Sequence, residues 1–360
     1  MKHDPDTSCI TIFSIALIAG YLNACSSPAS SETLPVTPAD ISMLSKNENR
    51  NNSGLYTFQG ICDGSAAVKI AADTILVAYD ESTSLFAFKF TGGTATARRD
   101  LNDLLDLKSA AELDIEAATL DDNRIWWLGS HSRDGKGRYA ANRHLLFATN
   151  IPAPDLRDLK LIVKPVDLTE ILVKSEITKA ALPVSAYSLP AKAGGINIEG
   201  IAAGSNGQLV IGFRSPLSGD GGLSGEALLV SILPAGDSVE ITRLDRLKLG
   251  DRGIRDIVRN DGTGFMIIAG AVNTGKPSAL YEWNGIEPPQ LIQDLDTLNP
   301  EGLVNIAKQW LILSDDGKVQ RADSEASDGM RSCDRIRSKN RLGEAHPGVF
   351  FRAQMIDAPQ

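Results

Sequence analysis

The fold is decided by one stretch in the middle of the chain, Glu199-Gly-Ile-Ala-Ala-Gly-Ser-Asn-Gly-Gln-Leu-Val-Ile-Gly-Phe-Arg214. Two apolar segments in it are separated by Ser205-Asn206-Gly207, a tripeptide typical of a hairpin turn. An acidic residue opens the first segment, and small residues follow it. The stretch therefore predicts two short antiparallel strands with a charged residue at their start.

The same unit occurs five times along the chain. Its first residues are Ser65, Glu116, Glu199, Arg255 and Glu301. In four copies a small residue stands 13 positions after the first residue, and in the Arg255 copy the spacing is one residue longer. A third apolar strand follows each pair, and a fourth, more polar strand often follows the third. Four antiparallel strands repeated in this way are typical of the blades of a β-propeller.

We therefore predict an all-β fold, a β-propeller with five four-stranded blades, and keep six blades as the alternative. The interval of 83 residues between Glu116 and Glu199 contains no further unit start. It predicts an insertion in the second blade. The charge of the chain, 36 basic against 45 acidic side chains, argues against nucleic-acid binding, which needs a basic surface.

The N-terminus carries a targeting signal. Residues 9–22 form an apolar run that is too short to cross a bilayer but is suited to a signal peptide. The run ends in Leu22-Asn23-Ala24-Cys25, which resembles the lipobox of bacterial lipoproteins. The resemblance implies cleavage after residue 24 and lipidation of Cys25, and the alternative is a secretory peptide that is cleaved nearby without lipidation.

Three segments follow from this interpretation. Residues 1–24 are expected to be a lipoprotein signal peptide, residues 25–54 a flexible tether rich in Ser, Pro and Asn, and residues 55–360 a single propeller domain. We expect the protein in the bacterial cell envelope, held by its lipid at the outer membrane on the periplasmic or the surface side. The membrane is then its first partner.

The four cysteines have different expected fates. Cys9 leaves with the signal peptide, and Cys25 is the lipidation candidate. Cys62 opens the first blade and Cys333 lies in the last, so the two are neighbours in a closed ring in an oxidising compartment. We predict a disulfide between Cys62 and Cys333. Two unrelated buried thiols are the alternative.

Propeller topology also gathers charged residues at one mouth of the central channel. Each first residue lies there beside the end of the second strand, and longer loops surround this face. The acidic first residues Glu116, Glu199 and Glu301 are candidate ligands of Ca²⁺ or another divalent cation, which prefers oxygen ligands. His131 could form an acid–base pair with Glu116, so His131, Glu116 and Glu199 are the candidate catalytic residues.

Basic residues reach the same face. Arg133, Arg214 and Arg255, with Asp256, are candidate residues for binding a ligand, because guanidinium groups pair well with carboxylates and phosphates. The alternative is a structural network in which these arginines neutralise the glutamates.

Several of these segments together resemble the bacterial family called domain of unknown function 3616. They are Trp127-Leu-Gly-Ser-His131-Ser-Arg133, Asn142-Arg143-His144, Ile196-Asn-Ile-Glu199-Gly, Ile211-Gly-Phe-Arg214, Ile254-Arg255-Asp256-Ile257 and Pro300-Glu301-Gly-Leu. The resemblance covers roughly residues 60–357. It implies a propeller similar to the esterase-like phytase and gluconolactonase-like groups, in which a Glu-Gly strand start can help to bind metal. The family has no established activity, so the resemblance assigns no catalytic roles.

We therefore expect a membrane-tethered, extracytoplasmic propeller that binds a small polar or anionic ligand, or a protein partner, at the loop-rich face of its channel. The alternative is a metal-assisted hydrolase of phosphoesters, esters or lactones with glutamate ligands at the channel mouth. The sequence leaves open whether the protein is an enzyme.

Overall fold

The computed structural model describes residues 54–107, 112–260, 262, 264–273, 276–324, 326 and 329–358. The expected signal peptide, Cys25 and residues 26–53 of the expected tether lie outside these residues. No helix in the described part of the chain is long and apolar enough to span a membrane.

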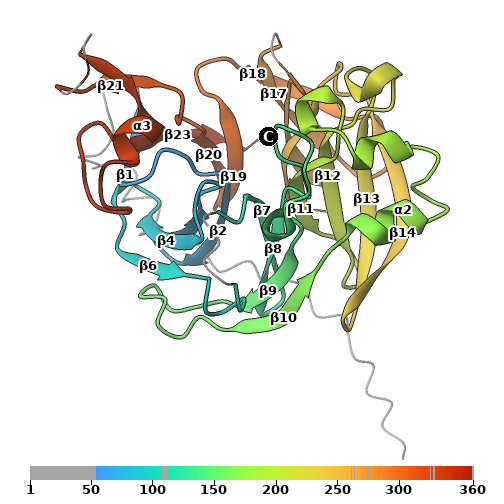
Figure 1. Ribbon diagram of the computed structural model, residues 1–360, viewed down its shortest axis with the longest axis horizontal. Helices are drawn as coiled ribbons and strands as arrows, with labels where there is room; N and C mark the ends of the chain where they lie inside the picture. The colour runs from blue at the N-terminus through green and yellow to red at the C-terminus, as the bar shows by residue number, and fades with distance from the viewer. Residues whose placement is uncertain are drawn as a thin grey trace, which may run out of the picture. The chain divides into compact units, whose positions relative to one another are not determined.

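Four blades are four-stranded antiparallel sheets (Figure 1). Blade 1 contains β2 (Ala66–Ala71), β3 (Thr74–Ala78), β4 (Ser84–Lys89) and β6 (Ala97–Asp100). Blade 2 contains β7 (Ile115–Asp121), β8 (Arg124–Gly129), β9 (Leu146–Asn150) and β10 (Leu161–Val166). Blade 3 contains β11 (Asn197–Ala203), β12 (Leu209–Ser215), β13 (Ala227–Ala235) and β14 (Ser238–Leu247). Blade 4 contains β15 (Gly253–Arg259), β16 (Phe265–Gly270), β17 (Ser278–Trp283) and β18 (Gln290–Leu295).

Blade 5 joins the two ends of the propeller. It consists of β19 (Pro300–Ile306), β20 (Gln309–Ser314), β23 (Phe350–Asp357) and β1 (Leu55–Gln59), with the two residues of β5 (Gly93–Thr94) at its outer edge. In Figure 1 the blue β1 lies beside the red β23, and the two strands pair antiparallel. The chain thus enters the propeller in the blade in which it also ends.

The blades form a closed ring. The inner strands β2, β7, β11, β15 and β19 each contact the next, and β19 contacts β2. The prediction of a five-bladed, all-β propeller is confirmed.

The predicted disulfide between Cys62 and Cys333 is also confirmed, with 5.8 Å between the two Cα atoms. Cys62 lies between β1 and β2, and Cys333 begins the short helix α3 (Cys333–Arg337), which follows the hairpin β21 (Gln320–Ala322) and β22 (Met330–Ser332). The bond crosses 271 residues of chain. Loop-closure entropy alone gives such a bond a stabilisation of about 5 kcal/mol.

The insertion of the second blade runs from β10 to β11. It contains the short helix α2 (Thr169–Lys174) and the 3-10 helices η2 (Val184–Tyr187) and η3 (Ala191–Ala193). Two further 3-10 helices, η1 (Ala141–Arg143) and η4 (Asp220–Gly222), lie in loops of blades 2 and 3. The insertion packs its apolar residues Leu168, Leu172 and Leu182 into the core between blades 2 and 3.

The core fills the spaces between neighbouring blades. Trp126 and Trp127 show how one strand serves two of these spaces: Trp126 packs with residues of blade 3, and Trp127 packs with residues of blade 1. Successive side chains of a strand point to opposite faces of the sheet, so a blade strand with both faces covered is apolar throughout. This is why the second strands, such as β3 (Thr74–Ala78) and β8 (Arg124–Gly129), consist mostly of buried residues.

Candidate functional site

A backbone irregularity positions the charged residue at the start of four inner strands. Strand pairing shifts register at Glu116, Glu199, Arg255 and Glu301, each of which lies between two residues that keep their partners. A bulge of this kind bends the strand and redirects one side chain. The ion pairs described below show that it brings side chains from different blades together.

The glycine after two of these glutamates has a steric cause. A Cβ atom on Gly200 would lie 2.9 Å from Cγ2 of Ile257 in the next blade. A Cβ atom on Gly302 would lie 2.8 Å from the backbone oxygen of Gly64. The Glu-Gly pair therefore places a charge at the strand start and lets the neighbouring blade approach closely.

Blade 1 supplies a different residue from the one suggested by the spacing. The Ser65 hydroxyl donates to the backbone oxygen of Ile115, 2.7 Å away, and so joins blades 1 and 2. The charged residue of this blade is Asp63, which the sequence interpretation missed. The sequence feature that could have identified Asp63 is the pair Asp63-Gly64. It repeats the pattern of an acidic residue followed by glycine in Glu199-Gly200 and Glu301-Gly302.

One part of the channel mouth is an ion-pair network. Arg255, 5% exposed, has its Nε 2.8 Å from Oε2 of Glu199, and its Nη2 contacts Glu301. Arg214 donates from Nη1 to Oε1 of Glu199 at 2.7 Å, and Asn197 donates from Nδ2 to the same oxygen at 2.6 Å. The structural alternative therefore describes this network well: each arginine is paired with a carboxylate.

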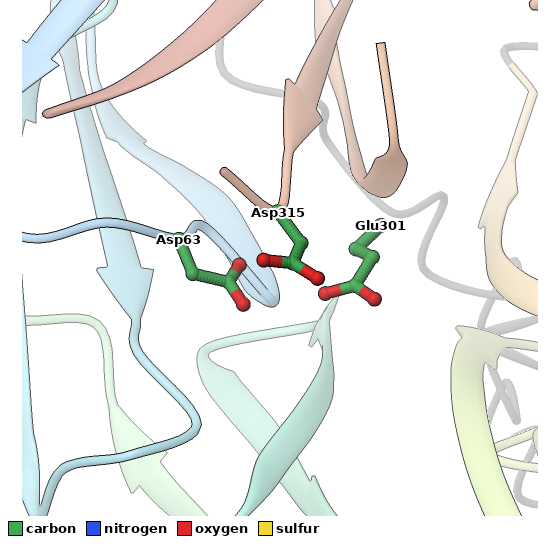
Figure 2. Close-up of side chains that lie close together, drawn as sticks. All are labelled: Asp63, Glu301 and Asp315. Atoms are coloured by element: carbon green, nitrogen blue, oxygen red, sulfur yellow. The ribbon is translucent and has the colours of Figure 1, made fainter. Parts of the chain in front are cut away.

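A second part of the mouth collects three carboxylates, of which Glu301 contacts Arg255 and the other two form no ion pair with the described residues. Asp63 precedes β2, Glu301 lies in β19 and Asp315 follows β20, and one oxygen from each lies within 4.8 Å of the others. Figure 2 shows the three carboxylates turned toward one another. Asp315 accepts bonds from the backbone N–H of Gly317 at 2.8 Å and from Nδ2 of Asn299 at 2.9 Å.

Asp63 is the least satisfied member of this group. Its side chain is buried, with 3% of the residue exposed, and Oδ1 has no hydrogen-bond partner among the described residues. Burial raises its pKa well above the usual range, and the negative charges of Asp80, Asp315 and Glu116 add to the effect. Burial also raises the pKa of Asp315. A buried carboxylate oxygen without a donor needs either a proton or a cation.

A second carboxylate group lies in blades 1 and 2. Asp80, Asp114 and Glu116 also offer one oxygen each within 4.8 Å of one another. Asp114 accepts a bond from the Ser130 hydroxyl and lies 3.3 Å from Nη1 of Arg143, so it already has partners. Burial raises the pKa of Glu116 well above its usual range, and Glu199, Asp114 and Asp80 add to the effect.

These two groups fit a hard cation by their chemistry. Ca²⁺ is bound by six to eight oxygens at about 2.3–2.6 Å, and carboxylates are its preferred charged ligands. The cluster Asp63–Glu301–Asp315 supplies three carboxylates and one buried oxygen that lacks a partner. Of the predicted ligands Glu116, Glu199 and Glu301, only Glu301 belongs to this cluster. Glu116 is in the second group, and Glu199 is held in the ion-pair network.

His131 lies in a different environment from the one expected of a general base. Its Nδ1 lies 2.9 Å from the backbone oxygen of Gly129, and its Nε2 accepts the backbone N–H of Leu168 at 3.1 Å. Burial lowers its pKa to about 4. The ring is therefore neutral with both nitrogens engaged. In the described part of the chain, no hydrogen bond or ion pair joins His131 to Glu116.

Two further predicted ligand-binding residues bond to the backbone. Arg133 donates from Nε to the Tyr187 oxygen at 2.5 Å and from Nη1 to the Gly137 oxygen at 3.2 Å. Asp256 accepts the N–H of Leu303 at 2.7 Å and that of Ile257 at 2.7 Å. Arg133 thus links a loop of blade 2 to the insertion, and Asp256 links blade 4 to blade 5.

Comparison with solved structures finds matches at low identity. The PQQ-bound aldose sugar dehydrogenase of Streptomyces coelicolor is 8% identical, with a TM-score of 0.41 over 84% of this chain and 98% of that one. Glutaminyl cyclase of Myxococcus xanthus is 12% identical, with a TM-score of 0.39 over 84% and 95%. The calcium-binding protein regucalcin of Agrobacterium tumefaciens is 11% identical, with a TM-score of 0.35 over 83% and 92%.

Comparison of the sequence itself gives the family. The sequence matches none of the curated proteins compared with it. The family described as "Protein of unknown function (DUF3616)" matches residues 64–146 and 155–308, which together are more than half of the chain and include parts of all five blades. The resemblance carried by the strand starts is thereby confirmed, and the chain belongs to the DUF3616 family.

Proposed function

We propose that this protein binds a divalent cation, with Ca²⁺ as the first choice, at Asp63, Glu301 and Asp315 in the mouth of its channel. Through the open positions of that cation it binds a small polar or anionic ligand. The protein's part is to hold the ion in a rigid ring, while the ion attracts the oxygen atoms of the ligand.

One observation carries this proposal: Oδ1 of Asp63 is buried and has no donor among the described residues, and the Asp63 carboxylate faces two further carboxylates. Buried polar atoms in native proteins are almost always paired, and an exception points to a missing water or ion. Three carboxylates this close together repel one another. A bound cation would bond to the unpaired oxygen and would also reduce the repulsion between the carboxylates.

The same site is a poor match for an anion held by arginines. Arg255 and Arg214, the two arginines nearest these carboxylates in the ion-pair network, are each paired with Glu199. The uncompensated charge that remains is negative. An anionic ligand at this mouth is therefore expected to need the cation between it and the carboxylates.

Calorimetric titration of the mature, metal-depleted chain with Ca²⁺ tests the proposal. We expect one strong site, and we expect Asp63→Asn to weaken it at least 100-fold, because the variant removes a charged ligand and keeps the shape. Asp122→Asn is the matched control, because it is the same substitution at an exposed residue in a turn. Heat that does not saturate in the wild type, or equal affinity in wild type and Asp63→Asn, would reject the proposal.

Glu116 favours hydrolysis as a second candidate function. It lies in the second carboxylate group, it makes no hydrogen bond or ion pair with the described residues, and its pKa is raised well above its usual range. A carboxyl with a raised pKa keeps its proton to a higher pH than usual and can donate it to a leaving group. A panel of phosphoesters, esters and lactones tests this role. Activity that requires Ca²⁺ and falls at least 100-fold in Glu116→Gln, with cation binding retained, would support hydrolysis.

Attachment to the membrane is a separate proposal, which rests on the segment around Cys25. Mass spectrometry of the mature protein should find its first residue to be a diacylglyceryl-modified Cys25. Cys25→Ala should leave the chain uncleaved or release it from the membrane fraction. A mature N-terminus at another residue without lipid would contradict lipidation.

A further inference from the structure

Arg255 lies at the boundary between the ion-pair network and the carboxylate cluster of the proposed cation site. Its Nη2 contacts Oε1 of Glu301, which belongs to the cluster, and its Nε lies 2.8 Å from Oε2 of Glu199, which does not. Only 5% of Arg255 is exposed, and charges that are buried in this way are weakly screened by solvent and salt. Its positive charge therefore acts strongly on the cluster.

The local backbone holds the guanidinium group at this boundary. The pairing of β15 with β16 shifts register at Arg255, between Ile254 and Asp256. On the partner strand, Gly270 leaves room for the aliphatic part of the side chain: a Cβ atom there would lie 3.0 Å from Cγ of Arg255 and 3.3 Å from its Cδ. The bulge and the glycine together fix where the positive charge lies.

Glu199 is already neutralised by another arginine. Nη1 of Arg214 donates to Oε1 of Glu199 at 2.7 Å, so Arg255 is the second guanidinium group at this carboxylate. Two guanidinium groups and one carboxylate leave one positive charge in excess. Among the described residues, the other carboxylate that pairs with Arg255 is Glu301, so the excess charge is directed at the cluster.

The charge of Arg255 also reaches Asp63 and Asp315. Burial, the largest effect, raises the pKa of both carboxyl groups, and the positive charge of Arg255 opposes it in both. A positive charge that stabilises these carboxylates also repels a cation bound between them, and this repulsion grows in proportion to the charge of the ion. Arg255 therefore disfavours a trivalent ion more than a divalent one.

Glu301 can serve Arg255 and a cation together. Arg255 contacts Oε1, and the second oxygen of the carboxylate can still bind a metal ion, because an ionised carboxylate accepts several bonds. The three carboxylates of the cluster carry three negative charges, and Arg255 balances one of them. One divalent cation neutralises the two charges that remain.

We propose that Arg255 makes this site selective for divalent over trivalent cations, an inference that rests on the proposed cation site. Arg255 acts through its charge and through Glu301 and does not touch the ion, so it is a positioning residue. Tb³⁺ binds carboxylate oxygens as Ca²⁺ does and carries one more positive charge. It is therefore the competitor against which the selectivity is measured.

Calorimetric titrations of the mature, metal-depleted chain with Ca²⁺ and with Tb³⁺ test this inference through the ratio of the two Kd values. Arg255→Met removes the positive charge and should raise the preference for Tb³⁺ over Ca²⁺ about tenfold or more. Arg255→Lys keeps a positive charge at the same position and should stay within about threefold of the wild-type ratio. Arg157→Met is the same substitution as the first at an exposed residue, and it should leave the ratio unchanged. The second carboxylate group is identical in every variant, so its charges cancel from the comparison.

Circular dichroism establishes which variants are folded. If Arg255→Met is not folded, Glu199→Gln makes the opposite change, because it leaves Arg255 with Glu301 as its carboxylate partner and adds to the net positive charge. Glu199→Gln should therefore weaken Tb³⁺ more than Ca²⁺, with a change in the ratio of about fivefold or more.

The outcomes separate the selectivity role from the cation site itself. A ratio that is equal in wild type and folded Arg255→Met, or in wild type and Glu199→Gln, would overturn the role of Arg255 and leave the cation site standing. A ratio that shifts as much in Arg255→Lys as in Arg255→Met would also overturn it, because the effect would then be one of packing. A wild type that does not bind Ca²⁺, or binds it as Asp63→Asn does, would reject the proposed function instead.

Discussion

Two halves of the channel mouth carry similar residues and differ in how their charges are balanced. The paired half consists of Glu199, Arg214 and Arg255, where each carboxylate or guanidinium group lies within 3 Å of an opposite charge. The unpaired half consists of Asp63, Asp80, Glu116 and Asp315, whose pKa values are all raised by burial. Glu301 contacts Arg255 and completes the carboxylate cluster, so it connects the halves.

The difference shows what a charged residue at a propeller channel contributes. The inner strand of blade 4 starts with an arginine, where three other blades have glutamate. This arginine pairs with carboxylates, so that half of the mouth is a structural ion-pair network. The other half keeps an excess of carboxylates, which is unfavourable without a counter-ion. Charge balance, rather than position in the repeat, therefore separates structural residues from candidate ligands.

The largest expected effect tests what holds the unpaired half together. Asp63 follows Cys62 directly, so the disulfide to Cys333 anchors the loop that carries it. Replacing both cysteines by serine should destabilise the domain by about 5 kcal/mol and weaken Ca²⁺ binding, as measured by urea unfolding and calorimetry. Unchanged stability on reduction of the native chain would show that β1 alone closes the ring.

The next effect breaks the paired half. Arg255→Met should destabilise the domain by about 3 kcal/mol, because it removes the guanidinium partner of Glu301 and one of the two guanidinium partners of Glu199. Arg157→Met is the control, since Arg157 is exposed and should leave the urea midpoint unchanged. Added Ca²⁺ should recover part of the lost stability in Arg255→Met, because the freed carboxylates can bind it. A variant as stable as the wild type would mean that the network contributes nothing.

His131 gives a pH-dependent effect that involves neither half directly. Its folded pKa of about 4 is below the unfolded value of about 6.5, so its neutral form contributes stability above pH 6.5. That contribution is lost as the pH falls from 6.5 toward 4, and it amounts to about 3 kcal/mol. The difference in the free energy of unfolding between wild type and His131→Asn should shrink by this amount over that pH range. Asparagine is chosen because it tolerates the positive φ of 53° at residue 131. A difference that does not change with pH would contradict the neutral, buried ring.

The smallest expected effect is a substitution of a buried residue that stabilises the domain instead of destabilising it. Asp63 has a folded pKa above its unfolded value, so its protonated form stabilises the domain at low pH and this contribution is lost as pH rises. In metal-free protein at pH 8, Asp63→Asn should raise the free energy of unfolding, on the order of 1 kcal/mol. Saturating Ca²⁺ should make the wild type the more stable of the two. Destabilisation by Asp63→Asn without metal would argue that Asp63 is a structural residue.

The architecture follows from the sequence because it depends on periodic features. The spacing of 13 residues between strand starts and small residues reports the length of a hairpin, and this length is the same in four of the five blades and one residue longer in the fifth. The pairing of Cys62 with Cys333 follows from ring closure, which brings the ends of the chain together. Both predictions rest on backbone geometry, which is shared by all repeats.

The site was harder to predict because it depends on the exceptions to the repeat. The spacing selected Ser65 in blade 1, but that strand has no bulge at its start, and Ser65 bonds to the Ile115 oxygen. The carboxylate comes from Asp63, two residues earlier. The partners of His131 and Arg133 come from the insertion, whose path has no periodic signal. Which charges are already paired is a property of side-chain packing, so the sequence pattern could not separate Glu199 from Glu301.

A crystal structure of the mature chain grown with Mn²⁺, analysed by anomalous scattering, tests the central claim most directly. Mn²⁺ shares the oxygen ligands of hard cations and marks its own position. We predict an anomalous peak bound by Asp63, Glu301 and Asp315, with Oδ1 of Asp63 as one of its ligands. A channel mouth without such a peak, in which a water or a proton satisfies Oδ1 of Asp63, would contradict the account.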